Sequence, residues 1–181
     1  MKIKKAFDIC KKSGSITTYF INGEQWLCDG SALYPILGVP ELSEEYICQL
    51  YDINDKQREK ICFHIGADVP QKIDFNDATE NEVPAEPLSI NIVVDGLGEC
   101  VPLLWERGLI LIKRQYLAPL SDLQDDNITY WVRYYLENED KVYVVVKIGL
   151  LMYAIITPIE PLDNIARDIE SLYIAAKTTI E

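Results

Sequence analysis

The sequence predicts an α+β protein, built mostly of antiparallel sheet with flanking helices. Short segments rich in β-branched and aromatic residues are separated by turn dipeptides, and apolar residues recur at helical spacing near both ends of the chain. The 181 residues are 49% hydrophobic and 25% charged, with only 9 glycines and 9 prolines, which is typical of a folded globular protein. This length allows a sizeable core in one large domain or in two small ones.

Residues 1–66 are predicted to form a first half, in which a helix precedes three strands. Ile3, Phe7 and Cys10 recur at helical spacing. Asn22-Gly23 is a strong signal for a two-residue hairpin. The elements expected in this half are a helix at 3–12, strands at 16–21, 25–28 and 32–36, a helix capped by Ser43, a helical turn at 55–59, and a strand at 60–65.

Residues 67–87 are predicted to be a flexible acidic connector. Residues 68–86 contain six acidic residues and one lysine, for a net charge of −5, and prolines recur through the segment. Such a composition buries too little apolar surface to offset the backbone entropy lost on ordering, apart from an anchor such as Ile73 or Phe75. We therefore expect limited proteolysis to cut the chain here first.

Residues 88–181 are predicted to form a β-rich second half that ends in a helix. The expected elements are a hairpin of 89–94 and 100–105, a strand at 109–112, a short helix at 114–123, strands at 128–136, 142–147 and 150–156, and a helix after Pro161. The apolar stripe of the last helix comprises Leu162, Ile165, Ile169, Leu172, Tyr173 and Ala176. We expect this stripe to dock on the sheet or on the same helix of a second subunit.

The order of elements repeats, because residues 3–36 read helix and three strands, and residues 109–158 read strand, helix and three strands. Two such βαβββ units in one domain resemble the plan of the DNA polymerase sliding clamps, with the segments 109–117 and 142–158 carrying the likeness. The resemblance implies that helices line the inner, DNA-facing surface. It therefore implies DNA contacts through the lysines of the first helix: Lys4, Lys5, Lys11 and Lys12. The chain departs from ring-forming clamps because it has one such domain and an added terminal helix.

A second resemblance concerns residues 26–35, which read Trp-Leu-Cys-Asp-Gly-Ser-Ala-Leu-Tyr-Pro. This stretch is similar to small uncharacterised proteins of bacterial prophage and mobile-element regions. The resemblance implies a mobile element or prophage as the biological setting.

The charge of the chain argues against nonspecific nucleic-acid binding. Lys plus Arg number 17 against 29 for Asp plus Glu, which gives a formal charge of −12 and an isoelectric point near 4.5. The acid is spread over both halves, so neither half is a basic DNA-binding module. The N-terminus has no apolar stretch of the signal-peptide type, and no apolar run approaches the length of a membrane span. We expect a cytoplasmic protein without a membrane partner.

The sequence offers no catalytic, cofactor-binding or metal-binding set of residues. His64 shares a strand face with Cys62, but no activating element or nucleophile elbow accompanies the pair. Asp122, Asp125 and Asp126 form an acidic cluster that lacks the glycine and glutamate of an EF-hand loop. The five cysteines contain no C-x-x-C pair and are expected to be buried small hydrophobes. We expect a protein that is not an enzyme and needs no cofactor.

Residues 130–135 suggest a surface for a partner. Strand alternation puts Trp131, Arg133 and Tyr135 on one face, where an exposed aromatic strand can bind a protein partner or mediate self-association. A single arginine makes nucleic acid the less favoured ligand of this face. The sequence therefore favours a non-enzymatic binding or assembly protein, and its alternative is a clamp-like replication accessory that contacts DNA through the helix lysines.

Overall fold

The computed structural model describes residues 1–123, 128–136, 138–161 and 163–180, without the side chains of 139, 163, 164 and 175–180. It confirms the predicted α+β class. The helices are α1 (Ile3–Ser13), α2 (Glu44–Leu50), α3 (Asp55–Arg58), the 3₁₀ helix η1 (Arg114–Leu120) and α4 (Asp163–Ile180). The strands of the first half are β1 (Ser15–Ile21), β2 (Glu24–Cys28), β3 (Ala32–Ile36) and β4 (Cys62–Ala67). The later strands are β5 (Glu82–Pro87), β6 (Ile92–Val94), β7 (Gly98–Trp105), β8 (Gly108–Lys113), β9 (Ile128–Tyr135), β10 (Asn138–Ile148) and β11 (Leu151–Ile156).

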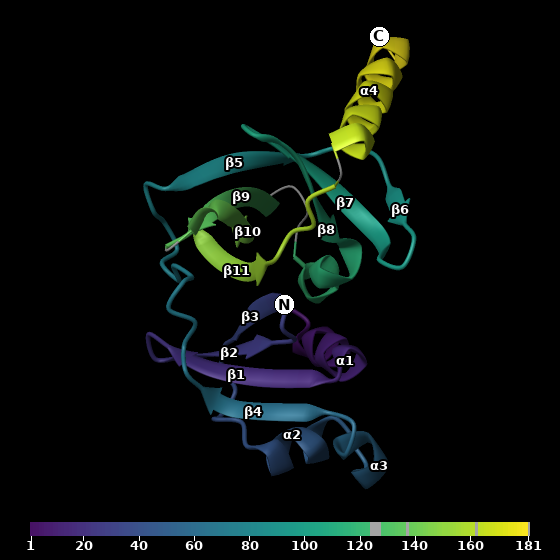
Figure 1. The fold of residues 1–181 in the computed structure, drawn as a ribbon. Helices are drawn as coiled ribbons and strands as arrows, with labels where there is room; N and C mark the ends of the chain where they lie inside the picture. Colours follow the sequence, from purple (N-terminus) through teal and green to yellow (C-terminus); the bar gives the residue numbers. More distant parts are fainter. Residues whose placement is uncertain (124–127, 137, 162, 181) are drawn as a thin grey trace.

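The two halves of the chain share a sheet. Its strand order is β4-β1-β2-β3-β11-β10-β9-β5-β7-β6, with β8 paired to β7. β1 and β4 pair in parallel, and the other strand pairs described are antiparallel. The halves meet where β3 pairs with β11, with Ile155 opposite Leu33. Figure 1 shows the β1–β4 part below and the later strands above.

The later strands close into a ring. β5 pairs with β9 through Glu82–Ala85 and with β7 through its last two residues, so it joins two stretches of sheet. β8 pairs with β7, and Leu111 of β8 forms a bridge with Ile159, which follows β11. Since β9, β10 and β11 are neighbours, these pairings complete a closed circuit. Side chains that point into the middle of the ring, such as Val132 and Val144, are therefore fully buried.

The main core runs from the inside of the ring to the space under α1. Alternate residues of the ring strands enter it, including Leu103, Ile112 and Val144. Phe7 and Cys10 of α1 reach the same core from the first half. The phenol of the buried Tyr34 on β3 donates a hydrogen bond to the carbonyl of Tyr116 in η1, at 2.9 Å. This contact ties η1, which packs beside α1, to the central sheet.

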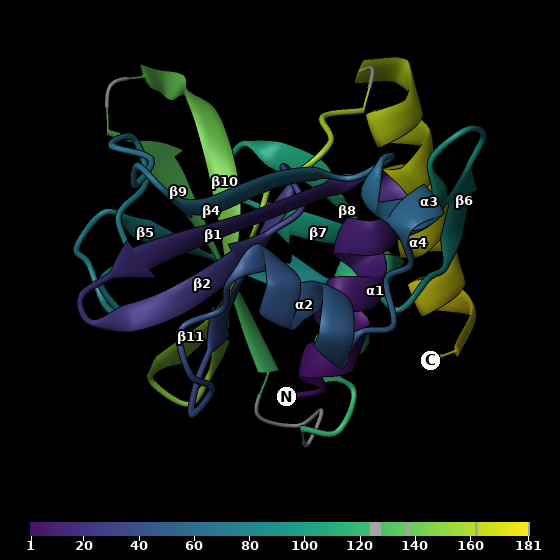
Figure 2. The same cartoon turned by 90° about the horizontal axis from the view of Figure 1, so that it is seen from below.

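A second core lies on the opposite face of the sheet. Its buried members are Ile21, Trp26, Cys28, Leu33, Tyr143, Val145, Met152 and Ile155. Residues 68–81, which we call the strap, connect β4 to β5 and pass over this face, where Ile73 and Phe75 pack against the core. In Figure 1 the strap is the long trace at the left of the molecule. The two views place the strap and α4 on opposite sides (Figure 1 and Figure 2).

The C-terminal helix docks through only part of its predicted stripe. Ile169 is buried, and Ala166 and Tyr173 pack with it against the outer side of β8. Ile165 is 44% exposed and Leu172 is 68% exposed. Leu162 and the side chain of Ala176 lie outside the part of the chain that the structure describes. The helix therefore docks on the sheet, but with a narrower face than periodicity predicts.

Most predicted elements are confirmed, and the connector is where the structure differs. The Asn22-Gly23 hairpin forms, with φ values of 52° and 84° that match the turn these two residues favour. Residues 82–87, expected within the connector, form β5 instead. The physical reason is long-range: Glu82 lies opposite Arg133 in the β5–β9 register, so its carboxylate meets a cation distant in sequence.

Candidate interaction surface

Strand β9 shows the alternation that the sequence predicts, but the face that carries Trp131, Arg133 and Tyr135 is not exposed as expected. Trp131, Arg133 and Tyr135 point to the side that carries the second core. Arg133 was expected to be exposed, whereas its relative exposure is 1%. Trp131 and Tyr135 are half-buried. The reason is that the strap covers this face, so the aromatic strand already has a partner within the chain.

The Arg133 guanidinium holds the strap through its main chain. Nη1 donates to the carbonyls of Asp74 at 3.1 Å and Asn76 at 2.8 Å, and Nη2 donates to the carbonyl of Asp77 at 3.1 Å. Nε and Nη2 also donate to the Glu82 carboxylate at 3.0 and 2.6 Å. A guanidinium has five N–H groups, and each has a partner in this arrangement. Arg133 therefore clamps a peptide segment and keeps no N–H group for a further ligand.

Glu82 balances two buried cations. Its Oε2 pairs with Arg133 and its Oε1 pairs with Lys147 Nζ at 2.5 Å, while the side chains of the two cations are 1% and 5% exposed. The Lys147 ammonium also lies over the Trp131 ring, 5.1 Å from its centroid. One carboxylate for two cations gives this buried ion cluster a net charge of +1. The carbonyl dipoles of the strap supply the remaining compensation.

Further contacts fix the strap along its length. The Asp74 amide donates to the Tyr143 hydroxyl at 3.0 Å, and burial raises the pKa of that phenol. The Met152 amide donates to the Asp77 carboxylate at 2.8 Å, and the Leu136 amide donates to the Lys72 carbonyl at 3.0 Å. The ring of Phe75 meets Trp26 edge-on, with centroids 5.4 Å apart.

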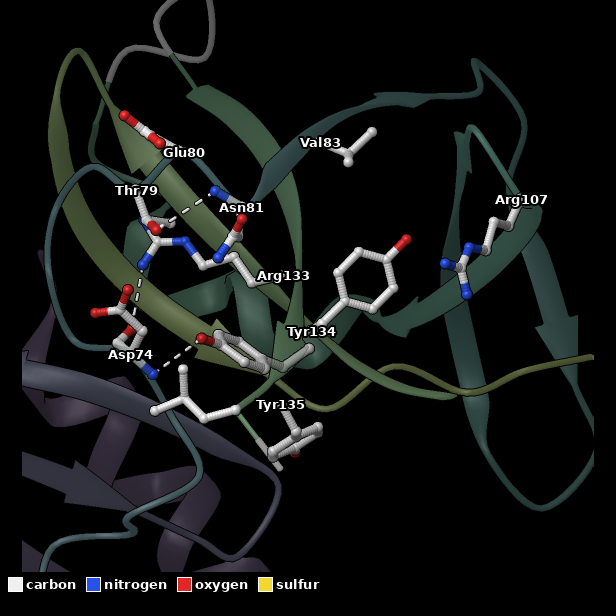
Figure 3. Close-up of a pocket in the computed structure, with 11 residues that line it drawn as sticks. Asp74, Thr79, Glu80, Asn81, Val83, Arg107, Arg133, Tyr134 and Tyr135 are labelled. Atoms are coloured by element: carbon white, nitrogen blue, oxygen red, sulfur yellow. Dashed lines mark hydrogen bonds between the residues drawn. The ribbon is translucent and has the colours of Figure 1, made fainter. Parts of the chain in front are cut away.

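The strap leaves a hollow of about 430 Å³ along its border with β9 and β10. Strap residues Asp74, Thr79, Glu80 and Asn81 form one wall, and the other lining residues are Val83, Arg107, Arg133, Tyr134, Tyr135, Leu136 and Tyr143. Figure 3 shows Arg133 reaching toward Asp74, while Arg107 lies on the far side of Tyr134. The strap is thus attached by the polar contacts named above and by the half-buried Ile73 and Phe75, and a hollow remains along part of its border with the sheet.

The lysines expected to contact DNA do not form one cluster. Lys5 donates to the Ser121 hydroxyl at 3.0 Å, and Lys11 donates to the Tyr51 carbonyl at 3.2 Å. Lys4 and Lys12 are exposed. A separate hollow of about 380 Å³ is lined by Asp8, Lys11, Lys12, Gln57, Lys60 and Ile61. Lys60 therefore lines the same hollow as Lys11 and Lys12 at the C-terminal end of α1, and Lys5 does not belong to this group.

The other chemically interesting residues lie apart from the strap. Cys62 and His64 are exposed on β4, contrary to the expectation of a buried Cys62. Cys10, Cys28 and Cys100 are buried as expected, and burial raises the pKa of the Cys28 thiol to about 11. Asp122 lies 3.5 Å from the N-terminal ammonium, whereas Asp125 and Asp126 are outside the described residues.

The described residues contain no group of three potential ligand side chains that could hold a metal ion. None of the helices traced in the structure is both long enough and apolar enough to cross a membrane.

Sequence reasoning missed the partners of Arg133. The sequence predicts that Glu82 lies in the connector and that Lys147 lies in a strand, and it does not indicate that the two side chains meet. A signal was present, because Lys147 follows a run of valines on a strand that is apolar on both faces, and a lysine there needs a buried partner. That partner lies 65 residues away in sequence, which no local pattern reveals.

Comparison with known proteins found no relatives: no family model matches the chain, and no curated protein or solved structure gives a significant match.

Proposed function

We propose that the chain is a non-enzymatic binding and assembly protein that acts through the outer face of β9 and β10, which its own strap covers until a partner takes its place. The observation that supports this most strongly is the contact set of Arg133, whose guanidinium donates to main-chain carbonyls of Asp74, Asn76 and Asp77. Donation to main-chain carbonyls is a means of holding a peptide segment.

The chemistry of the surface also favours binding over catalysis. The Arg133 N–H groups that do not pair with Glu82 all donate to main-chain carbonyls of the strap, so the donors that release of the strap would free are placed for the carbonyls of another peptide segment. The raised pKa of Tyr143 keeps its phenol protonated at neutral pH, and a phenol in that state is a poor base. Aromatic rings, an arginine and alternate strand side chains are instead the components of peptide-binding faces.

The biological setting that we propose, the cytoplasm of a bacterium carrying a mobile element or prophage, rests on the resemblance of residues 26–35. It adds no chemistry to the surface, and the binding experiments below do not depend on it.

The proposal is tested with a strap-weakened variant that carries Ile73→Ser and Phe75→Ser. These changes remove the two apolar contacts of the strap with the second core and leave Arg133 in place. We expect the variant to keep a cooperative melting transition and to bind the aromatic sulfonate dye ANS in a saturable manner. The matched control is Leu150→Ser with Leu151→Ser, which makes the same type of change at residues that are 83% and 55% exposed.

Two results would contradict the proposal. A strap-weakened variant that melts cooperatively but binds no more dye than the control would mean that no binding face lies under the strap. Loss of cooperative melting in this variant and also in the milder Phe75→Ala variant would mean that the strap is an inseparable part of the fold.

The second candidate is a DNA-binding accessory that uses α1. It is favoured by the five lysines and single aspartate of residues 1–14, and by the hollow in which Lys60 joins Lys11 and Lys12. If Lys4, Lys5, Lys11 and Lys12 each contact a phosphate, the slope of log K against log salt should be about −3.6. Fluorescence anisotropy with a labelled duplex measures this slope, and absence of binding at low salt would remove the candidate.

A further inference from the structure

We propose that the partner of the β9–β10 face is an acidic, extended peptide segment with an aromatic anchor, which binds as the strap does and replaces it. This inference rests on the function proposed above and specifies its ligand. The strap serves as a bound example of that ligand, since it crosses the face with the sequence Ile73-Asp74-Phe75-Asn76-Asp77.

The aromatic anchor is required by the second core. Phe75 meets Trp26 edge-on at 5.4 Å between centroids, and Trp131, Tyr135 and Tyr143 belong to the same cluster. A partner that leaves this place empty would expose Trp26, which is 4% exposed under the strap. A phenyl-sized side chain fills it with the edge-to-face geometry that aromatic rings prefer.

The preference for acid follows from the local charge, which opposes the charge of the whole chain. Arg133 and Lys147 share one carboxylate, that of Glu82, so this ion cluster under the strap has a net charge of +1. The Asp77 carboxylate also accepts the amide of Met152 at 2.8 Å. A partner carboxylate two residues after the aromatic anchor would accept the same N–H group. An acidic segment is therefore complementary at the site even though the protein carries −12 overall.

Exchange of one segment for another is physically feasible because Arg133 recognises main-chain carbonyls. Its bonds to the carbonyls of residues 74, 76 and 77 do not depend on the side chains there. When the strap leaves, the guanidinium stays paired with Glu82, and water replaces the carbonyls until a partner binds. The open face is therefore a hydrated site in which Glu82 keeps its ion pairs with Arg133 and Lys147.

The test is direct binding of a fluorescent peptide that has the sequence of residues 68–81. We expect it to bind the Ile73→Ser/Phe75→Ser variant at least tenfold more tightly than the wild-type protein, whose own strap competes. Adding Arg133→Met to that variant should weaken binding at least tenfold. Two control peptides, one scrambled and one with Phe75→Ser, should not bind. Should the double variant fail to fold, Phe75→Ala alone serves as the acceptor.

The outcomes separate this inference from the proposed function. Dye binding without peptide binding would leave the β9–β10 face as a binding surface and would overturn its assignment to a strap-like acidic segment. Equal binding of the scrambled peptide would also overturn the assignment, because charge alone would then suffice. A wild-type protein that elutes as a dimer, when the Ile73→Ser/Phe75→Ser variant elutes as a monomer, would identify the occupant as the strap of a second copy, which contradicts a separate partner.

Discussion

Arg133 and Lys147 depend on Glu82, because it is the carboxylate that pairs with both of these buried cations. Removing one partner of a buried ion pair lowers the free energy of unfolding by more than the intact pair contributes to it. The reason is that the remaining charge is left uncompensated in a medium of low dielectric constant. Loss of Glu82 leaves two cations without a carboxylate. Loss of Arg133 leaves a balanced Glu82–Lys147 pair and frees carbonyls at the edge of the protein, where water can reach them.

Substitutions of Glu82 and Arg133 should therefore have different effects on stability. We expect Glu82→Gln to lower the free energy of unfolding by about 3–5 kcal/mol. Arg133→Met should cost less, about 1–3 kcal/mol, and should mainly release the strap to proteases. Urea denaturation measures the first effect and limited proteolysis the second. The control is Arg107→Met, which alters an arginine with 57% side-chain exposure and should change stability by less than about 0.5 kcal/mol. Equal destabilisation by all three substitutions would contradict the role assigned to Glu82.

A second residue, Tyr34, makes stability sensitive to alkaline pH. It is fully buried, and burial raises the pKa of its phenol above the ordinary value. The folded state therefore retains this proton at a pH where the unfolded chain loses it. Stability from this source is fully present below the unfolded pKa of about 10 and is lost as pH rises above it.

Comparing the wild-type protein with Tyr34→Phe isolates this contribution. Above about pH 10 the free energy of unfolding of the wild-type protein should fall more steeply, by up to about 1.4 kcal/mol per pH unit. Urea denaturation at a series of pH values from 8 to about 11 measures the difference. Parallel curves for the two proteins would show that Tyr34 does not titrate in this way. At neutral pH the variant should lose only the hydrogen bond to the Tyr116 carbonyl, about 1 kcal/mol.

At the scale of elements, helix α4 carries both docked and exposed apolar residues. Ile169 is 7% exposed against β8, whereas Leu172, within a turn of it, is 68% exposed. We expect Ile169→Asp to lower the free energy of unfolding by more than about 2 kcal/mol, because it replaces a packed side chain with a charge. Leu172→Asp should change it by less than about 0.5 kcal/mol.

Thermal melting and size-exclusion chromatography test this pair of substitutions together. If Leu172→Asp destabilised the protein or changed its oligomeric size, the exposed part of the stripe would have to be covered in solution, contrary to the docking described for the single chain.

The elements also show what sequence can predict here. Local signals sufficed for the Asn22-Gly23 hairpin and for the position of α4 after Pro161. They also predicted the short helix after β8, which forms as the 3₁₀ helix η1 and ends three residues earlier than predicted, with Pro119 inside its last turn. They failed for the strap and β5, because Glu82 of β5 pairs with cations 51 and 65 residues away, one of which also holds the strap carbonyls. The composition of a segment predicts how it behaves alone in water. Whether the segment is ordered in the protein depends also on the charged residues that the fold places beside it.

At the scale of the whole molecule, the central sheet has cores on both faces, and these are covered in different ways. The ring and α1 cover one face with secondary structure, and the strap covers the other with irregular chain. Segments with few apolar contacts open locally at a lower free energy than the sheets beneath them. We therefore expect the strap to open at a lower free energy than the sheet beneath it, and the proposed binding function depends on this difference.

Native-state hydrogen exchange tests that difference most directly. The amides of Asp74, Leu136 and Met152 bond across the strap and report its opening, while amides of β10 report the sheet. We predict that the three strap reporters exchange through an opening that costs less free energy than global unfolding and depends weakly on low concentrations of urea, with the β10 amides still protected. If the reporters and the β10 amides instead exchanged with the same free energy and the same urea dependence, the strap would open only with the whole protein, which would contradict a releasable cover.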